Sequence, residues 1–176
     1  MRSLRVSITN SIIMENYIPH PRSGQSHDPR SAWVIIRQGS LLTIERQDRW
    51  GAYYVLPGGG QNPGEDLHQT LRRECLEEVG LEVIPGDLLF VRDYIGRNHE
   101  FASEDSKAHQ LELMFACQIK EGAVAATGPS PDIGQTAVRW LPIETLEKYP
   151  LYPKALIPCL QYLNENHHPV YLGDVN

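Results

Sequence analysis

One stretch of the chain, residues 59–81, most constrains what the chain can fold into, because it specifies both a helix and a set of charges. It reads GGQNPGEDLHQTLRRECLEEVGL and carries glycine, acidic and basic residues at the spacing G-x5-E-x7-R-E-x-x-E-E-x-G. The residues at these positions are Gly59, Glu65, Arg73, Glu74, Glu77, Glu78 and Gly80. With each identity near one in fifteen by average usage, the pattern has chance odds of roughly 10⁻⁸ per start position. This segment is therefore the strongest indicator of function in the chain.

The same segment carries the signals of a helix running from about Pro63 to Val79. Asn62 suits the N-cap, Pro63 suits the first helical position, and Glu65 then falls at the third, as in a capping box. Gly80 suits a left-handed C-cap. The apolar positions of this helix fall on one stripe, which is made of Leu67, Leu71, Cys75 and Val79.

Three glutamates of this helix, Glu74, Glu77 and Glu78, are spaced i, i+3 and i+4 and therefore share one face. One interpretation is a solvated acidic face, which is the usual outcome for a run of charge. However, like charges on one face repel by roughly 0.2–0.5 kcal/mol per pair, and carboxylates beside a core cost more unless they are paired or bind a metal. Arg73 offsets one charge, and a divalent cation offsets the rest. Oxygen ligands without His or Cys nearby favour Mg²⁺ or Mn²⁺ over Zn²⁺.

The pattern is the signature of the Nudix hydrolase family, which the chain resembles. Cys75 is the one departure, because the family usually has an aliphatic residue there, and a small apolar Cys can replace it in packing. The resemblance extends to SAWVIIRQGSLLTIER and WGAYYVLPGGG before the signature and to VRWLPIETL after it, so it covers roughly residues 31–163. It implies an α/β fold, the Nudix α/β/α sandwich around a central mixed sheet.

The resemblance also implies an activity, the hydrolysis of a nucleoside diphosphate linked to another group, in which metal ions neutralise phosphate oxygens and activate water. The metal ligands that it implies are the carboxylates of Glu74, Glu77 and Glu78, with the carbonyl of Gly59 as a further one. Glu65 and Arg73 match the pair that braces the loop against the helix. The glycine run at Gly58 and Gly59 lets the backbone approach a bound substrate closely.

Glu112 is a further candidate metal ligand outside the signature. In the stretch HQLELMFAC it shares a strand face with Gln110 and Met114, while the apolar neighbours point to the other face. A lone acid in so apolar a strand is either a site group or a residue of a sheet edge, because an unpaired buried carboxylate is costly.

Substrate contacts are expected from a strand end and a long polar loop. Arg46 ends a strand just before the site and is either a phosphate ligand or a surface arginine. The loop over residues 96–109 is of the length and polarity that often carry function. Its acids Glu100, Glu104 and Asp105 are candidates for the general base, and Glu100 and Glu104 are also candidates for substrate binding. Aromatic residues that offer a stacking surface for a base, or more commonly core packing, are Trp33, Trp50, Tyr53, Tyr54 and Trp140.

The chain divides into an N-terminal strand and loop at 1–30, a main domain at 31–166 and a C-terminal tail at 167–176. The N-terminal strand is expected at residues 4–8 and its Pro/Gly/Ser-rich loop at 18–31. A terminal helix is expected from Leu151 to Asn164. Further strands are expected at 32–37, 41–46, 53–56, 88–95, 110–119 and 137–141, with a helical turn at 143–148.

Composition limits the partners. The net charge of −6 and the lack of a Lys/Arg cluster argue against a nucleic-acid backbone as the main partner, and favour a small-molecule nucleotide held through metal. No stretch is long and apolar enough to span a membrane, and the N-terminus is too polar for a secretory signal. The three cysteines lie far apart in apolar runs, which favours reduced thiols and a cytoplasmic protein. A homodimer formed through the N-terminal strand stays open, as does a start at Met14 instead of Met1.

The family resemblance leaves the substrate open among three alternatives. The general look of the chain, with its long loop, leans toward the ADP-ribose and nucleotide-sugar branch. No SQPWPFP-like stretch follows the signature, which argues against an NADH pyrophosphatase. A nucleoside triphosphate pyrophosphohydrolase of the housecleaning MutT type is the next alternative. A non-catalytic ligand sensor is the third, and the intact signature argues against it.

Overall fold

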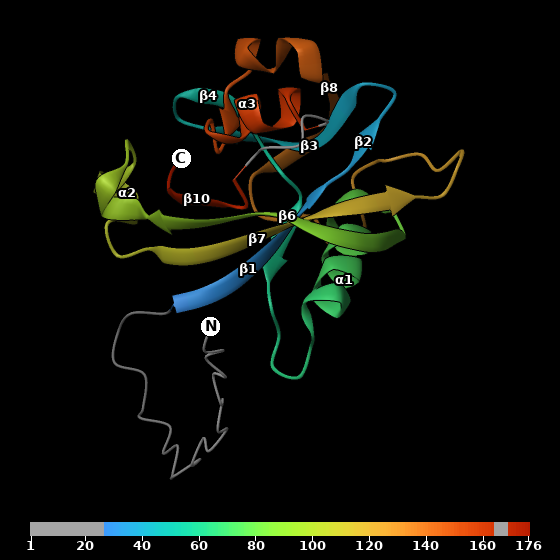
Figure 1. Cartoon of the computed structure of the whole chain (residues 1–176), viewed down its shortest axis with the longest axis horizontal. Helices are drawn as coiled ribbons and strands as arrows, with labels where there is room; N and C mark the ends of the chain where they lie inside the picture. The colour runs from blue at the N-terminus through green and yellow to red at the C-terminus, as the bar shows by residue number, and fades with distance from the viewer. Residues whose placement is uncertain (1–26, 164–168) are drawn as a thin grey trace, which may run out of the picture.

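The chain forms two β-sheets with helices packed on their outer sides, as Figure 1 shows for this computed structural model, which describes residues 27–163 and 169–176. The strands are β1 (His27–Val34), β2 (Ile36–Arg37), β3 (Ser40–Asp48), β4 (Gly51–Val55), β5 (Gly58–Gly60), β6 (Val83–Ile95), β7 (His109–Ile119), β8 (Gln135–Pro142), β9 (Leu151–Tyr152) and β10 (Tyr171–Asp174). The helices are α1 (Leu67–Val79), η1 (Gly96–Asn98), α2 (Ala102–Asp105), η2 (Ile143–Lys148) and α3 (Leu156–Gln161).

Both sheets are mixed. The first has the order β10-β6-β7-β1-β5, in which β1 runs parallel to β7 and antiparallel to β5. The second has the order β2-β3-β4-β9, in which β9 runs parallel to β4. The strand β8 also belongs to this sheet and pairs antiparallel with β3. A single apolar run joins the sheets, because β1 ends at Val34 and β2 begins at Ile36. The predicted α/β class with mixed sheets is confirmed, with the strands divided over two sheets.

Two apolar clusters lie on opposite sides of this framework. The first joins α3 and η2 to both sheets and includes Phe90, Met114 and Leu156. The second joins α1 to β1, β3 and β7, and there Trp33 is completely buried. The predicted apolar stripe of α1 is confirmed, because Leu71, Cys75 and Val79 are each 0% exposed. All three cysteines are free, as expected.

The predicted start of the signature helix was wrong. The helix begins at Leu67, and its N-cap is Asp66, which forms a capping box with Gln69. Asn62 and Glu65 instead close a turn, in which the Glu65 N–H donates to the Asn62 carbonyl at 3.0 Å and Gly64 has φ +91°. The helix begins later than predicted because the Glu65 carboxylate binds the Arg73 guanidinium from a turn that precedes the helix. The predicted C-cap is confirmed at Gly80, with φ 66°.

The predicted terminal helix from Leu151 to Asn164 was also wrong in extent. Leu151 pairs with Tyr54 in β9, and the helix α3 covers only Leu156–Gln161. Pro153 interrupts the helical pattern, because a proline cannot donate a backbone hydrogen bond and disfavours helix in the residue before it. Position 164 lies outside the described residues.

The other expected strands are confirmed with shifted ends, except that the strand expected at 32–37 is divided between β1 and β2, which belong to different sheets. The loop expected at 18–31 contains the start of β1 at His27, and the strand expected at 4–8 lies outside the described residues. The residues expected as a tail contribute β10, which runs parallel to β6. The loop expected at 96–109 contains η1 and α2. In the two ranges that the structure describes, no helix has the length and apolar character that a membrane crossing requires.

Candidate active site

Glu78 is the most unusual residue of the signature, because its carboxylate is 1% exposed at the edge of the core. Its Oε2 accepts a hydrogen bond from the Gly58 backbone N–H at 2.8 Å. Its Oε1 is buried without a hydrogen-bond partner, and the nearest cation is the Arg46 guanidinium at 4.0 Å. Burial raises the pKa of Glu78 to about 8, with the Gly58 N–H acting in the opposite direction. Such a buried oxygen is one that a metal ion can satisfy.

Gly59 lies directly against the carboxylate of Glu74. A Cβ at this position would come within 2.2 Å of the Glu74 carboxyl carbon, whereas a Cβ at Gly60 would meet nothing within 4 Å. Gly59 belongs to β5, and it pairs with Ser31 of β1. The glycine run therefore brings backbone against the acidic face of α1.

Arg73 holds the acidic groups of the signature together. It donates to Glu65 through Nε at 2.6 Å and Nη2 at 2.9 Å, which is the bidentate geometry that favours Arg–carboxylate pairs. Its Nη1 donates to Glu74 at 2.7 Å and to Glu77 at 3.2 Å, and its Nη2 also donates to the Gly60 carbonyl at 3.0 Å. The hydrogen bonds from Arg73 lower the pKa of Glu65 to about 2. The predicted pairing of Glu65 with Arg73 is present in this geometry.

The acidic face has the donor chemistry of a Mg²⁺ site, but Arg73 occupies part of it. Glu74, Glu77 and Glu78 all supply carboxylate oxygens, the ligands that this ion prefers. Within the described residues, no three His, Cys, Asp or Glu side chains are grouped closely enough to hold an ion as they stand. The reason is visible in the contacts, because Arg73 binds two of these three carboxylates.

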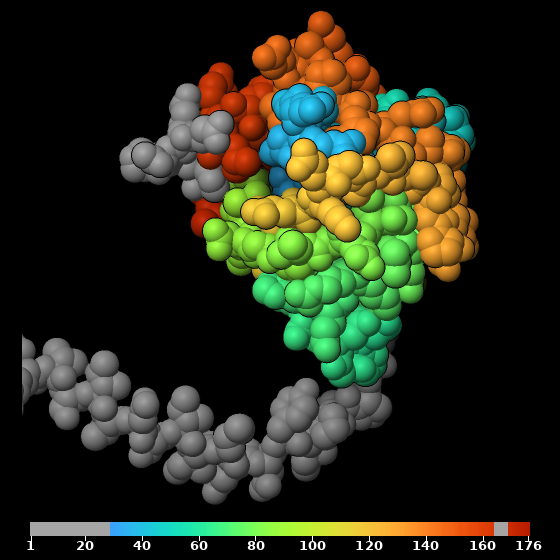
Figure 2. Space-filling model, turned by 90° about the vertical axis from the view of Figure 1, so that its right-hand side faces the viewer, coloured from blue at the N-terminus to red at the C-terminus, as the bar shows by residue number. Residues whose placement is uncertain are grey.

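The segment between β7 and β8 covers the C-terminal end of α1, and Figure 2 shows it against the surface beside β2. The Gln135 amide donates to the Glu78 carbonyl at 2.8 Å, and Asp132 forms a 2.5 Å ion pair with Arg46. Arg46 thus lies between Glu78 and Asp132. No local sequence pattern predicts the pairing of Arg46 with Asp132, because the two residues lie far apart along the chain.

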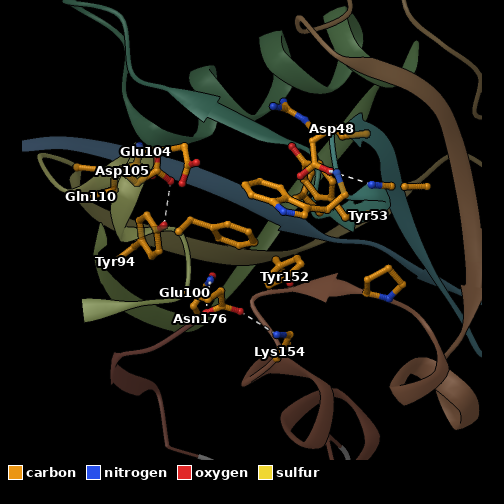
Figure 3. A pocket seen from close by; sticks show the side chains of 18 of the residues that line it. Asp48, Tyr53, Tyr94, Glu100, Glu104, Asp105, Gln110, Tyr152, Lys154 and Asn176 are labelled. Atoms are coloured by element: carbon orange, nitrogen blue, oxygen red, sulfur yellow. Dashed lines mark hydrogen bonds and ion pairs between the residues drawn. The ribbon is translucent and has the colours of Figure 1, made fainter. Parts of the chain in front are cut away.

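Arg46 also lines a pocket of about 970 Å³ between the two sheets (Figure 3). The signature carboxylates do not line it, so Arg46 is the side chain that joins the pocket to the acidic face. Figure 3 shows Tyr94, Asp105 and Gln110 on one side of the pocket and Tyr53 and Tyr152 on the other. Further lining residues that sequence reasoning did not single out are Arg30, Asp48, Arg92, Phe101, Lys154 and Asn176.

The three loop acids all line this pocket, and each has a partner. Glu100 pairs with Lys154 at 2.8 Å, Glu104 pairs with Arg49, and Asp105 accepts a hydrogen bond from the Tyr94 hydroxyl at 2.9 Å. The Lys154 hydrogen bond lowers the pKa of Glu100. The structure therefore brings the predicted loop acids to the pocket rather than to the acidic face of α1.

Glu112 lies on β7, does not line the pocket, and pairs with Arg92 at 2.5 Å. In register, Glu112 stands between Arg30 of β1 and Arg92 of β6. Its role as a metal ligand stays a prediction, and the contact that the structure records for it is with an arginine.

The aromatic candidates fall into two groups. Trp50 and Tyr53 line the pocket, whereas Trp33 is buried in the core. Phe101 and Tyr152 extend the pocket group: ring centroids lie 5.8 Å apart for Trp50 and Phe101, and 5.5 Å apart for Phe101 and Tyr152. Among the remaining candidates, Tyr54 packs edge-on against Tyr149, and Trp140 lies under the Arg37 guanidinium.

Comparisons with known proteins agree on the family. The NUDIX domain model matches residues 27–161. The chain is 29% identical over 135 residues to the NAD-capped RNA hydrolase NudC of Stutzerimonas stutzeri, covering 74% of this chain and 43% of that protein. It is 30% identical over 89 residues to the nucleoside triphosphatase NudI of Salmonella arizonae, covering 48% of this chain and 63% of that protein. Its fold resembles a NUDIX hydrolase from Nitrosomonas europaea, with a TM-score of 0.63, 22% identity and coverage of 82% and 94% of the two chains. The chain therefore spans about half the length of these curated relatives.

Proposed function

Because the chain belongs to the Nudix family, we propose that it is a Mg²⁺-dependent hydrolase that cleaves the pyrophosphate linkage of a nucleoside diphosphate derivative. Mn²⁺ is the alternative ion. The observation that carries the proposal is the buried Glu78 carboxylate, whose Oε1 has no hydrogen-bond partner and lies 4.0 Å from Arg46 at the pocket. A fold that retains such a costly group without using it would be destabilised for no gain.

In this proposal Glu74, Glu77 and Glu78, with the Gly59 carbonyl, hold the ion. Glu78 is positioned by the Gly58 N–H, and Glu74 is positioned by its contact with Gly59. The bound ion supplies positive charge that neutralises phosphate oxygens and activates water. For Glu74 and Glu77 to hold an ion, Arg73 would have to release both carboxylates, and its bidentate pair with Glu65 would still hold the guanidinium beside them.

Arg46 binds the substrate between the ion and the pocket. Arg46 lies 4.0 Å from Glu78 and also lines the pocket. A phosphate group bound by Arg46 would therefore lie where the acidic face meets the pocket. The Arg46 Nε is buried without a hydrogen-bond partner, so this cation has an unused donor. Trp50, Tyr53 and Phe101 provide ring surfaces for a base within the same pocket.

The substrate that we propose first is ADP-ribose or another nucleotide sugar. The support is the pocket itself, where Glu100 and Asp105 offer carboxylates to sugar hydroxyls beside the aromatic rings. The general base comes from the segment 96–108, and Glu100, Glu104 and Asp105 are its candidates. A nucleoside triphosphate is the alternative, favoured by the similarity to NudI. A non-catalytic sensor is the alternative from another class.

The expected setting is a cytoplasmic protein that acts on small nucleotides, without nucleic acid or membrane as a partner. The three free cysteines support a reducing compartment, and the net charge of −6 disfavours binding to a nucleic-acid backbone. A homodimer remains part of the proposal, with gel filtration as its test.

Product analysis with ADP-ribose and Mg²⁺ tests the substrate. We expect AMP and ribose 5-phosphate, and we expect the combined Ala substitution of Glu100, Glu104 and Asp105 to suppress both. A matched control removes three exposed acids away from the pocket, at Glu82, Asp87 and Glu121, and should retain turnover. Pyrophosphate release from a nucleoside triphosphate with no turnover of nucleotide sugars selects the alternative substrate. Nucleotide binding without any hydrolysis selects the sensor.

A further inference from the structure

The strand β10 lies beside β6 and holds the start of the segment that forms one wall of the pocket (Figure 1). Asp174 Oδ1 accepts a hydrogen bond from the Ile95 backbone N–H at 3.0 Å and contacts His99 Nε2 at 2.6 Å. Its Oδ2 accepts a hydrogen bond from Asn98 Nδ2 at 2.6 Å. One carboxylate therefore binds three groups where the segment 96–108 leaves β6.

The residues that follow β10 reach the pocket itself. The Val175 carbonyl accepts a hydrogen bond from Arg92 at 2.7 Å. The Asn176 side chain contacts Arg92 and also donates to Glu100, with both distances 3.4 Å. Arg92, Glu100 and Asn176 all line the pocket. The C-terminal segment thus contacts Arg92 of β6 and Glu100 of the segment 96–108, which both line the pocket.

Apart from the hydrogen bond from the Tyr94 hydroxyl to Asp105, the other side-chain ties of the segment 96–108 are exposed. None of the residues of α2 is buried, which is typical of an element of low local stability. Its ion pairs across the pocket, Arg49 with Glu104 and Lys154 with Glu100, join side chains that are 38–65% exposed, and such pairs contribute little. The Asp174–His99 contact is less exposed, at 26% and 13% for the two side chains. Asp174 therefore ties the start of this segment to β10, whereas the Tyr94 hydroxyl ties its far end to β6 through Asp105.

We propose that Asp174 is a positioning residue for substrate binding, because it holds the segment 96–108 in the conformation that places Glu100 and Phe101 in the pocket wall. This inference deepens the proposed function and rests on it for its kinetic part, since it treats the pocket as the substrate site. Asp174 makes no contact with the signature glutamates in the described residues, so its effect falls on substrate affinity rather than on the ion.

The size of the effect follows from population arithmetic. A ligand binds a partly populated conformation with an affinity reduced by the populated fraction. If Asp174→Ala lowers the fraction of the competent conformation to about a tenth, KM rises about tenfold. Substrate that does bind selects the competent conformation, so kcat stays within about threefold.

Hydrogen exchange and steady-state kinetics together test the inference. In Asp174→Ala we expect backbone amides of residues 96–108 to exchange about tenfold faster, while amides of α1 keep their protection. KM is measured for ADP-ribose or ATP, whichever the wild-type protein hydrolyses. Asp87→Ala is the matched control, because Asp87 is an exposed aspartate on β6, the strand that pairs with β10. This variant should match the wild type in both measurements.

Asp174→Asn guards against a variant that fails to fold. It keeps the size of the side chain and one acceptor, but it sets an amide donor against the Asn98 amide, so an intermediate rise in exchange and KM is expected. Unchanged exchange over 96–108 in either folded variant overturns the inference, as does a fall in kcat with KM unchanged. If the wild-type protein hydrolyses no nucleotide sugar and no nucleoside triphosphate, the proposed function fails, and the exchange result alone decides on the anchoring role of Asp174.

Discussion

Two carboxylates of one signature have opposite environments, and this separates their roles. Glu78 is buried with one oxygen unpaired, and its pKa is raised to about 8 by that burial. Glu65 is bound by Arg73, by the Asn62 backbone N–H and by the Thr70 hydroxyl, and its pKa is lowered to about 2. A carboxylate whose two oxygens are both hydrogen-bonded braces the loop, whereas one with an oxygen that accepts no hydrogen bond is available to a metal.

Glu65 makes stability depend on acid pH. Its folded pKa is about 2 against an ordinary 4.5, so its contribution is present above pH 4.5 and is lost as pH falls toward 2. Glu65→Gln should therefore flatten the fall in unfolding free energy over this window, which urea titrations at stepped pH measure. The variant should keep more turnover than Glu78→Gln at neutral pH. Loss of all turnover in Glu65→Gln with normal melting would contradict a bracing role.

Gly59 and Gly60 form a matched pair for testing the position of Glu74. A Cβ at Gly59 meets the Glu74 carboxylate, which is the movable end of a side chain, whereas a Cβ at Gly60 meets nothing. We expect Gly59→Ala to fold and to lose about 10²-fold of its Mg²⁺-dependent turnover, the cost of about 1 Å of misplacement at a reacting centre. Gly60→Ala should retain most of its turnover, because its carbonyl still accepts from Arg73. Equal turnover of the two variants would show that the position of Glu74 does not matter for the reaction.

At the scale of elements, periodicity predicted the buried face of α1 and glycine chemistry predicted its end. The start was missed because two residues, Asn62 and Asp66, both have side chains suited to an N-cap. The pairing of Glu65 with Arg73 decides between them, and it pulls Glu65 out of the helix into a turn. Sequence signals at helix starts compete, and side-chain contacts settle the competition.

Substitution of the two cap candidates measures which one caps α1. The Asp66 carboxylate accepts a hydrogen bond from the Gln69 backbone N–H at 2.8 Å. In return, the Gln69 side-chain oxygen accepts a hydrogen bond from the Asp66 backbone N–H at 2.7 Å. Asp66→Ala should lower the unfolding free energy by about 1 kcal/mol, as expected for loss of an N-cap. Asn62→Ala should cost less than half of this in the same chemical denaturation experiment. A larger loss of unfolding free energy in Asn62→Ala than in Asp66→Ala would instead show that Asn62 is the N-cap.

At the scale of the whole molecule, the acidic face could be predicted from the sequence and the pocket could not. The signature residues lie within one helix and its approach, so their spacing alone brings them together. The pocket depends on β1 pairing with β7 and on β10 pairing with β6, contacts between residues that lie far apart along the chain. Val170 and Tyr171 favour a strand, but the stretch at Tyr171–Asp174 is too short for the sequence to show where it pairs. The paired acids Glu100, Glu104 and Asp105 were found because the length and polarity of their loop are local features.

The central claim is that the acidic face of α1 binds a divalent ion, and calorimetric titration with Mg²⁺ tests it most directly. The wild-type protein should bind the ion with saturable heat, and Glu78→Gln should lose at least about tenfold in affinity. The variant should melt no lower than the wild type in EDTA, because it removes a buried unpaired carboxylate and keeps a hydrogen-bond acceptor for the Gly58 N–H. Equal Mg²⁺ affinity in the wild type and in folded Glu78→Gln would contradict the account.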